Sequence, residues 1–359
     1  MLKMKTRKPK SITILICALA LMLVMYNCKK KDDPLPDKPD EEITKELDDI
    51  KVAPVTITPP APVESTEANV ETSAKAGELN SGLGSITDAN SIPASVTTAA
   101  TEVTAAISES ELNTLSNVDA ALINAVKEGG EIPAEVKAAL DHAASNPALQ
   151  EYLPTFTLPT VNGTAVTGRT ATSPNLVTPQ QLAANESIEA VQDASDVCVA
   201  AAESAYQAKK TELDASKSAK DAEITAAYNA AIAPLAAEEE ACKAGIPAKF
   251  AAYRAAIDEQ VASALANLER VKPFIGPLYP ILKALINIQA LNAYAGLNNL
   301  EAASLAACTA KTAAATTNAQ AARDANLAAS QAAYDAALAS AAEVRAKLIA
   351  SCHNQGGGN

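Results

Sequence analysis

Aromatic side chains are scarce in this sequence. Among its 359 residues the aromatic fraction is 3%, tryptophan is absent, and no aromatic residue lies between Tyr26 and Tyr152. Hydrophobic residues make up 48% of the chain, but alanine is the commonest of them, and alanine suits helices better than it fills a thick core. The composition therefore argues against two packed globular domains and favours a slender helical element with a mostly disordered N-terminal segment.

Histidine is also scarce, and the residues that catalysis or metal binding needs do not form a recognisable set. The two histidines, His142 and His353, lack the spacing of a zinc protease and have no evident nucleophile partner. The acidic run Glu238–Glu240 is explained more simply by a solvated helix face than by a cation site. We therefore expect no catalytic residues, no cofactor and no metal. A hydrolase that uses residues 109–155 is the enzymatic alternative.

The charge balance is acidic. The formal net charge is −13, and residues 1–27 carry five basic and no acidic side chains, so the remainder of the chain carries −18. Such a chain is repelled by nucleic-acid phosphates and by anionic lipid head groups. We therefore expect no nucleic-acid partner, and membrane contact has to come from a lipid rather than from a basic surface.

The beginning of the chain has the layout of an export signal. Residues 3–10 are basic, and residues 12–25 form an apolar run that is short for a membrane-spanning helix and ends close to Cys28. This layout resembles the lipobox of bacterial lipoproteins, with Met25 three positions before the cysteine. The resemblance implies that residues 1–27 are a signal peptide and that Cys28 carries acyl chains such as palmitate. An uncleaved anchor with an incidental cysteine is the alternative.

The residues after Cys28 indicate a destination. Lys29 occupies the place where an aspartate would mark inner-membrane retention, and the charged tract 29–33 resembles the surface-export signals of some outer-membrane lipoproteins. The resemblance implies a lipid anchor in the outer membrane, facing the cell surface, with the periplasmic face as the alternative. Residues 28–100 are rich in proline and polar side chains without apolar periodicity, which predicts a disordered linker.

Helical patterns begin beyond residue 100. Apolar positions between 109 and 128 mark one helix, Pro133 opens a second, and Asn146–Pro147 starts a third. The threonine-rich residues that follow predict a loop or weak hairpin. We therefore expect residues 101–178 to form a small helical module with a loop.

Residues 179–353 consist almost entirely of helix formers, and residues 354–359 are expected to be a disordered tail. Residues that are apolar at all but one position recur every 11 positions in this region, a period typical of nearly straight helices that pack side by side. These positions are Val191, Ala202, Leu213, Ile224 and Leu235, and then Leu305, Thr316, Leu327, Leu338 and Ile349. The fold class predicted is all-α, with a long, antiparallel, alanine-rich helical hairpin or coiled coil as its main body.

Four cysteines locate the turn of this hairpin. Bridges between Cys198 and Cys242, or between Cys308 and Cys352, would require a turn in uninterrupted helical sequence. Pairing 198 with 352 and 242 with 308 instead gives two pairs whose residue numbers both add up to 550, as an antiparallel hairpin requires. The third connectivity, 198 with 308 and 242 with 352, would need parallel helices.

The midpoint of this register is residue 275, inside the strongest turn signal of the region. The predicted hairpin tip consists of Pro273, Phe274, Ile275, Gly276, Pro277, Leu278, Tyr279 and Pro280. The sequence leaves open whether the ascending helix folds back at Gly245–Pro247.

The function expected from these features is non-enzymatic. The chain is interpreted as a surface-exposed spacer or adhesin-like lipoprotein that presents a rigid helical rod to a protein partner of the envelope or of a host. A periplasm-facing structural lipoprotein that contacts another envelope component is the alternative. The partner and the oligomeric state are not predicted.

Overall fold

The computed structural model describes residues 38–168 and 196–354. Within them, one compact unit contains residues 38–53, 196–217 and 332–354, and a second contains residues 54–168 and 218–331. The two units are referred to below as the first and second unit, and each is described by itself.

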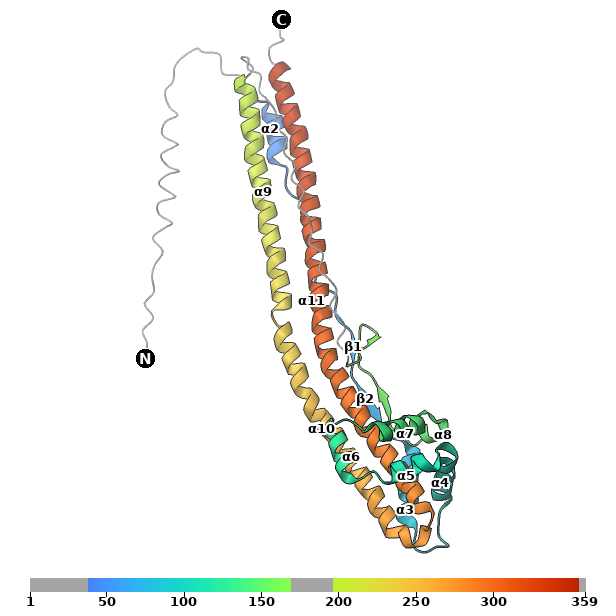
Figure 1. Cartoon of the computed structure of the whole chain (residues 1–359). Helices are drawn as coiled ribbons and strands as arrows, with labels where there is room; N and C mark the ends of the chain where they lie inside the picture. The colour runs from blue at the N-terminus through green and yellow to red at the C-terminus, as the bar shows by residue number, and fades with distance from the viewer. Residues whose placement is uncertain (1–37, 169–195, 355–359) are drawn as a thin grey trace, which may run out of the picture. The chain divides into compact units, whose positions relative to one another are not determined.

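Three long helices dominate the described residues, which confirms the predicted all-α class and the hairpin (Figure 1). The ascending arm contains α9 (Asp196–Ile232) and α10 (Leu235–Ile275), and the descending arm is α11 (Leu278–Asn354). The turn between the arms lies at Gly276, whose φ of 49° is unfavourable for any residue with a Cβ atom. The turn therefore falls one residue from the midpoint that the cysteine register predicts.

The expected interruptions of the ascending arm have different outcomes. Pro234 separates α9 from α10, whereas Gly245 and Pro247 lie inside α10, which continues through them. A proline inside a helix removes one backbone hydrogen bond but does not reverse the chain unless the flanking residues also leave the helix. The ascending helix therefore does not fold back at Gly245–Pro247.

A set of short helices, which we call the head, covers the turn end of the hairpin in the second unit (Figure 1). They are α3 (Ala74–Ser85), α4 (Ala94–Ala106), α5 (Glu109–Ser116), α6 (Ala120–Lys127), α7 (Ala134–Ser145) and α8 (Pro147–Gln150). The single helix predicted over 109–128 is in fact two, because Asp119 caps the first turn of α6 through the backbone N–H of Leu122, at 2.8 Å. Asn146 and Pro147 start α8 as predicted.

The core of the second unit lies between the head and the two arms. Phe250 and Tyr294 on the arms and Tyr152 in the head are the largest side chains in it, each no more than 2% exposed. Leucine, isoleucine, valine and alanine fill the remainder. The register predicted from the cysteines places Phe250 opposite Leu300 and Leu268 opposite Leu282, and all four side chains are buried.

Polar side chains of the arms attach the head by capping the C-terminal ends of its helices. Arg270 donates to the carbonyl oxygens of Leu83 and Ile86 at the end of α3, at 2.9 and 2.8 Å. The buried Asn287 donates to Leu115 O at the end of α5, at 2.8 Å. Asn298 donates in the same way to Val126 O at the end of α6. Because the last carbonyl groups of a helix have no partner within it, these contacts fix where each helix ends.

The predicted disordered linker is wrong for the residues that the structure describes. Three helices with buried side chains begin between residues 38 and 100, and among those side chains are Leu47, Leu79 and Val96, each no more than 2% exposed. The apolar contacts that order α2 and α3 come largely from the hairpin arms, which are distant in sequence, and α4 in turn packs against α3 and α8. The head consequently begins at α3, and the predicted boundary at residue 101 falls inside α4.

Five short strands join the segments on either side of the head helices. They are β1 (Ser65–Thr66), β2 (Asn69–Glu71), β3 (Thr155–Thr157), β4 (Thr160–Val161) and β5 (Thr164–Ala165). β4 pairs with both β1 and β5, and β2 pairs with β3, all antiparallel. The antiparallel pair of β4 and β5 is the weak hairpin that the threonine-rich sequence predicted. Phe156 on β3 packs against the Cα of Gly296 in α11, where a Cβ would lie 2.3 Å from its ring.

The first unit contains α2 (Glu41–Asp48) and parts of both arms. Leu47 and Leu213 are buried against Leu348 and neighbouring alanines. Lys209 is only 4% exposed, and its Nζ donates to the carbonyl oxygens of Asp48 and Ile50 at 2.8 and 3.3 Å. This buried ammonium group therefore caps the C-terminal end of α2 and holds the N-terminal segment on the arms.

Candidate functional site

Two disulfides join the arms in the predicted pairing. Cys198 bonds to Cys352 in the first unit, with Cα atoms 5.7 Å apart, and Cys242 bonds to Cys308 in the second, with Cα atoms 5.9 Å apart. Both separations are ordinary for disulfides. The two alternative connectivities are excluded by this pairing.

Polar contacts between the arms keep the same register in both units. Glu203 accepts from Arg345 at 2.5 Å in the first unit. In the second unit, Glu239 accepts from Thr309 at 2.7 Å. The residue numbers of both pairs add up to 548, close to the 550 of the disulfides. The antiparallel register is therefore the same where the arms are joined by polar side chains as where they are joined by cysteines.

The hairpin tip presents an exposed aromatic ring on a stiff turn. Phe274 is 36% exposed, and with Val197 at 63% it is one of two large hydrophobic side chains exposed among the described residues. Pro273, Pro277 and Pro280 are also exposed, whereas Ile275 is buried in the core. Because proline fixes φ and Ile275 is buried in the core, the backbone that carries Phe274 has little conformational freedom.

Tyr279 stabilises the base of this tip. Its ring packs under the Lys272 ammonium, 4.3 Å from the ring centroid, and its hydroxyl donates to Glu269 on the other side of the turn. Burial and the hydrogen bond to the Glu269 carboxylate raise the pKa of Tyr279 to about 12. The phenol is therefore neutral at physiological pH, and its contacts close the turn.

A recess of about 540 Å³, a volume that includes the solvent at its mouth, lies between the head and the arms. Hydroxyl and amide side chains line part of it, among them Ser73, Gln260 and Gln289, and none of the described residues that line it is charged. The Nε2 atom of Gln289 is buried without a hydrogen-bond partner among the described residues. An uncharged polar group is the chemistry that such a recess can accept.

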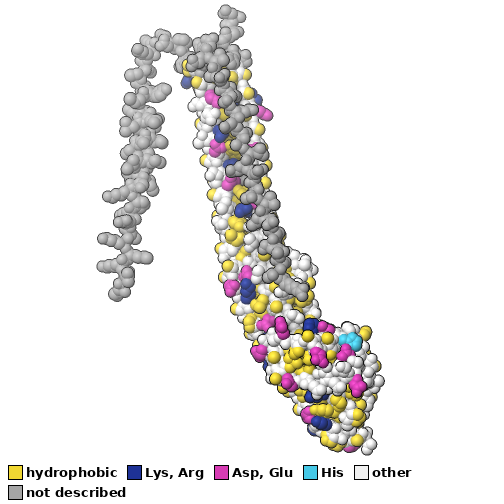
Figure 2. All heavy atoms as spheres, viewed as in Figure 1, with side chains coloured by type: hydrophobic (Ala, Val, Ile, Leu, Met, Phe, Trp, Pro, Cys, Tyr) yellow, Lys and Arg dark blue, Asp and Glu magenta, His cyan; other side chains and the backbone are white. Residues whose placement is uncertain are grey.

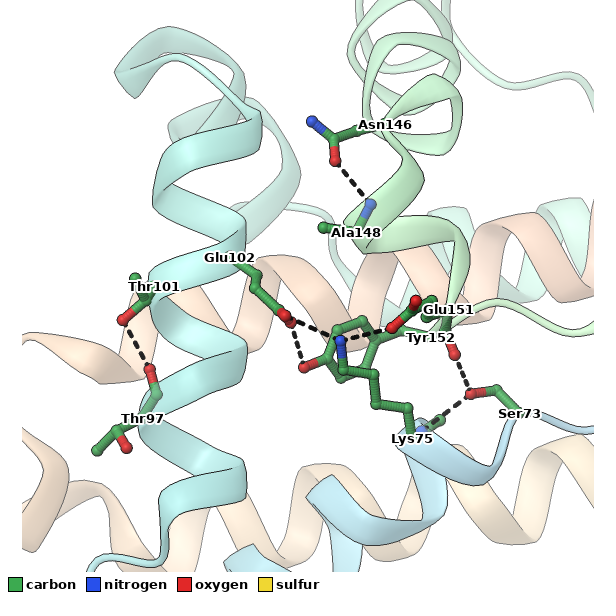
Figure 3. A network of polar contacts seen from close by, with 10 residues as sticks. Ser73, Lys75, Thr97, Thr101, Glu102, Asn146, Ala148, Glu151 and Tyr152 are labelled. Atoms are coloured by element: carbon green, nitrogen blue, oxygen red, sulfur yellow. Dashed lines mark hydrogen bonds and ion pairs between the residues drawn. The ribbon is translucent and has the colours of Figure 1, made fainter.

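A network of charged groups beside this recess connects α3, α4 and the end of α8 (Figure 3). Lys75 Nζ donates to Glu102 at 2.9 Å and to Glu151 at 2.8 Å, and it lies 4.6 Å from the centroid of the Tyr152 ring. The Tyr152 hydroxyl donates to the other oxygen of Glu102 at 2.7 Å. These residues were not predicted from the sequence, because no local pattern relates Lys75 to Tyr152, 77 positions later.

The protonation states of this network suit a structural role. Burial raises the pKa of the Tyr152 phenol, and the hydrogen bond to Glu102 raises it further. Burial alone would lower the pKa of Lys75, but its hydrogen bonds to Glu151 and Glu102 outweigh that effect and raise it. Burial opposes ionisation of Glu102, but hydrogen bonds from Tyr152 and Lys75 lower its pKa below the usual value. A general acid or base works best with a pKa near the operating pH, and none of these shifts moves a pKa toward neutral pH.

The other residues considered from the sequence lie apart from this recess. His142 on α7 pairs with Glu111 on α5 at 2.8 Å and is 56% exposed. Glu238 and Glu240 are exposed, as a solvated helix face predicts, whereas the Glu239 side chain is only 17% exposed and pairs with Lys243 at 2.5 Å. Cys28 lies outside the described residues. Figure 2 shows acidic and basic side chains scattered over the visible face rather than gathered into one patch of a single sign.

Neither a membrane-spanning helix nor a cluster of metal ligands occurs among the residues that the structure describes. Among residues 38–168 and 196–354, no helix combines the length and apolarity that crossing a bilayer requires. The same residues contain no group of three or more histidine, cysteine or acidic side chains placed to hold a metal ion. Comparison of the chain with protein-family models, with curated proteins and with solved structures finds no match.

Proposed function

We propose that this chain is a non-enzymatic lipoprotein of the bacterial outer membrane, anchored through Cys28, whose hairpin tip and head bind a protein partner of the envelope or of a host. The observation that carries the proposal is the exposed Phe274 ring on its proline-rich turn. A rigid exposed aromatic ring is the kind of anchor that dominates protein interfaces, because little conformational entropy is lost when it is buried.

The disulfides and the beginning of the chain support the envelope location. Two bridges that each join distant parts of the chain are typical of oxidising compartments. The basic and apolar leader, which ends at Cys28, is typical of exported lipoproteins. These features are independent of each other, and both are expected of a protein that acts outside the cytoplasm.

The docked α2 helix changes the expected geometry of the anchor. Asp40 caps α2 only 12 positions after Cys28. Twelve residues span at most about 43 Å even when fully extended. An acylated Cys28 would therefore keep the first unit close to the membrane surface, in contrast to the long flexible tether that the sequence suggested.

The interaction is tested by replacing Phe274 with a photo-reactive phenylalanine analogue in the full chain on intact cells. The same analogue at Val197, the other exposed large hydrophobic side chain, is the matched control. We expect a cross-linked protein adduct from position 274 that is absent from position 197. Equal labelling at both positions, or no adduct at position 274, would contradict the proposal.

The anchor is tested separately by Cys28→Ser and cell fractionation. We expect a variant of mature size to leave the membrane fraction, because no helix within residues 38–168 and 196–354 is long and apolar enough to span a bilayer. A variant that has the mature size and remains in the membrane fraction would refute the lipid anchor. Protease treatment of intact cells then distinguishes the cell surface from the periplasmic alternative.

A further inference from the structure

The four bridged cysteines differ sharply in their accessibility. Cys198, Cys308 and Cys352 are buried, with exposures of 2%, 3% and 7%, whereas Cys242 is exposed. A groove of about 870 Å³, solvent at its mouth included, is lined by Cys242, Cys308 and Lys311. A soluble thiol can therefore reach one end of the inner bridge, while both ends of the outer bridge are enclosed.

The order of the cysteines makes the native pairing the slower one to form. In an unfolded chain, Cys198 and Cys242 are separated by 44 residues, as are Cys308 and Cys352. The native partners are separated by 66 and 154 residues. Since the probability of loop closure falls roughly as the three-halves power of loop length, a 44-residue loop closes about six times as often as the 154-residue loop.

The short-range bridges are incompatible with the folded arms. Cys198 and Cys242 both lie on the ascending arm, and 44 helical residues separate them by roughly 66 Å. A disulfide requires Cα atoms within about 7 Å. Any bridge formed early between neighbouring cysteines must therefore be broken before the hairpin can form.

We propose that Cys242 is a thiol–disulfide exchange site, through which a dithiol isomerase of the oxidising compartment converts the short-range bridges into the native pair. The location in an oxidising compartment rests on the proposed function, whereas the exchange between disulfides does not depend on it. Lys311 lies three positions after Cys308 and lines the same groove, and its positive charge favours the thiolate that Cys308 becomes when it is expelled from a bridge.

The exchange conserves electrons and bridges. The thiolate of the partner attacks Cys242 Sγ, forms a mixed disulfide, and expels Cys198 as a thiolate. Cys198 then attacks Cys352 Sγ, which forms the outer bridge and expels Cys308. Cys308 in turn attacks Cys242 Sγ, which closes the inner bridge and returns the partner as a thiolate. Two bridges are present before and after, so no net oxidant or reductant is consumed.

The proposal is tested by refolding the full chain from its reduced, unfolded state in a glutathione redox buffer. Samples are quenched by alkylation and mapped as non-reduced peptides. We expect 198–242 and 308–352 linkages first, about sixfold in excess over 198–352, followed by a glutathione adduct at Cys242 and then the native pair. The double variant Cys198→Ser/Cys352→Ser, which cannot form a short-range bridge, should form its 242–308 bridge without a delay.

A second measurement does not depend on refolding. Limiting dithiothreitol added to the native, oxidised protein should open 242–308 while 198–352 persists. Opening of the outer bridge first, a glutathione adduct mainly at another cysteine, or direct formation of both native bridges would overturn the proposal. These outcomes leave the membrane anchor and the tip contact untouched, so failure here is distinguishable from failure of the proposed function.

Discussion

Lys209→Met tests how the N-terminal segment is held in the first unit. The Lys209 ammonium donates to two carbonyl oxygens at the end of α2 and to Glu212 Oε2 at 2.7 Å, and its side chain is 4% exposed. Methionine keeps the apolar stem but removes the charge and all three hydrogen bonds. The carbonyl groups of Asp48 and Ile50 would then lose their contacts with the Lys209 ammonium group.

The size of the effect follows from these contacts. A hydrogen bond from a charged donor contributes about 1.5–3 kcal/mol when it is shielded from solvent. The pair with Glu212, whose side chain is 62% exposed, adds at most roughly 0.5 kcal/mol. If the bond to Asp48 at 2.8 Å is counted in full and the longer contact with Ile50 at 3.3 Å is not, the free energy of local opening of α2 falls by about 2 kcal/mol, which corresponds to about 30-fold faster amide exchange.

Hydrogen–deuterium exchange measured on peptides that cover residues 40–50 checks this prediction. Lys210→Met is the matched control, because the neighbouring Lys210 makes only an exposed ion pair with Asp214 at 2.9 Å. The control should change exchange in α2 by less than about twofold. Equal protection of α2 in Lys209→Met and in the unmodified chain would refute the role assigned to this lysine.

Two further predictions concern the second unit. Gly296→Ala should destabilise it by about 1–3 kcal/mol, because the new Cβ would lie 2.3 Å from the Phe156 ring. Gly245→Ala, whose Cβ meets nothing within 4 Å, should be neutral or stabilising. Urea unfolding compares the two variants, and equal changes in their free energies of unfolding would contradict this prediction. The free energy of unfolding should decrease as the pH drops below about 4.5, since Glu102, whose pKa is lowered in the folded state, contributes stability only while its carboxyl is ionised. It should also decrease as the pH rises above about 10, since Tyr152, whose pKa is raised in the folded state, contributes stability that is lost as its phenol ionises. A constant free energy of unfolding from pH 3 to 7 would refute the acid part of this prediction.

The hairpin was predictable from sequence because its determinants are periodic or paired. The four cysteines at matched intervals fix the register. The 11-residue spacing correctly predicts the buried face of the ascending arm at Ala202, Leu213 and Ile224, but on the descending arm the predicted positions from Leu305 to Ile349 are only half-buried. The buried face of that arm has the same period and follows Cys308, Ala319, Ser330, Ala341 and Cys352. The turn signal around Gly276 agrees with that register independently. Each of these features can be recognised without knowing any contact between distant residues.

The N-terminal half of the head was missed for a physical reason. Leu79 and Leu83 are spaced for one face of a helix, as are Val96 and Val103, but prolines and threonines surround them and no aromatic residue is nearby. These helices become ordered because α10 and α11 supply both the apolar surface and polar caps such as Arg270. The partners of α3 on α10 lie more than 150 positions away and those of α4 lie on α3 and α8, so no pattern within one of these helices could indicate them.

The same limit applies to the extended segment that precedes the head. Thr58 is held by Asn326, whose side-chain amide accepts from the Thr58 N–H at 3.0 Å and donates to its carbonyl oxygen at 2.9 Å. A proline-rich segment of this kind has the composition of a disordered linker. Asn326, which lies 268 positions away, holds this segment on α11, and the sequence around Thr58 gives no sign of that contact.

Non-reducing peptide mapping of the protein isolated from the membranes of producing cells, with free thiols blocked during lysis, tests the central claim most directly. If two disulfides join the arms of the hairpin, one peptide pair will link Cys198 to Cys352 and another will link Cys242 to Cys308. A mature protein whose peptides link Cys198 to Cys242, or Cys308 to Cys352, would contradict it, because neither bridge can form between residues of one continuous arm.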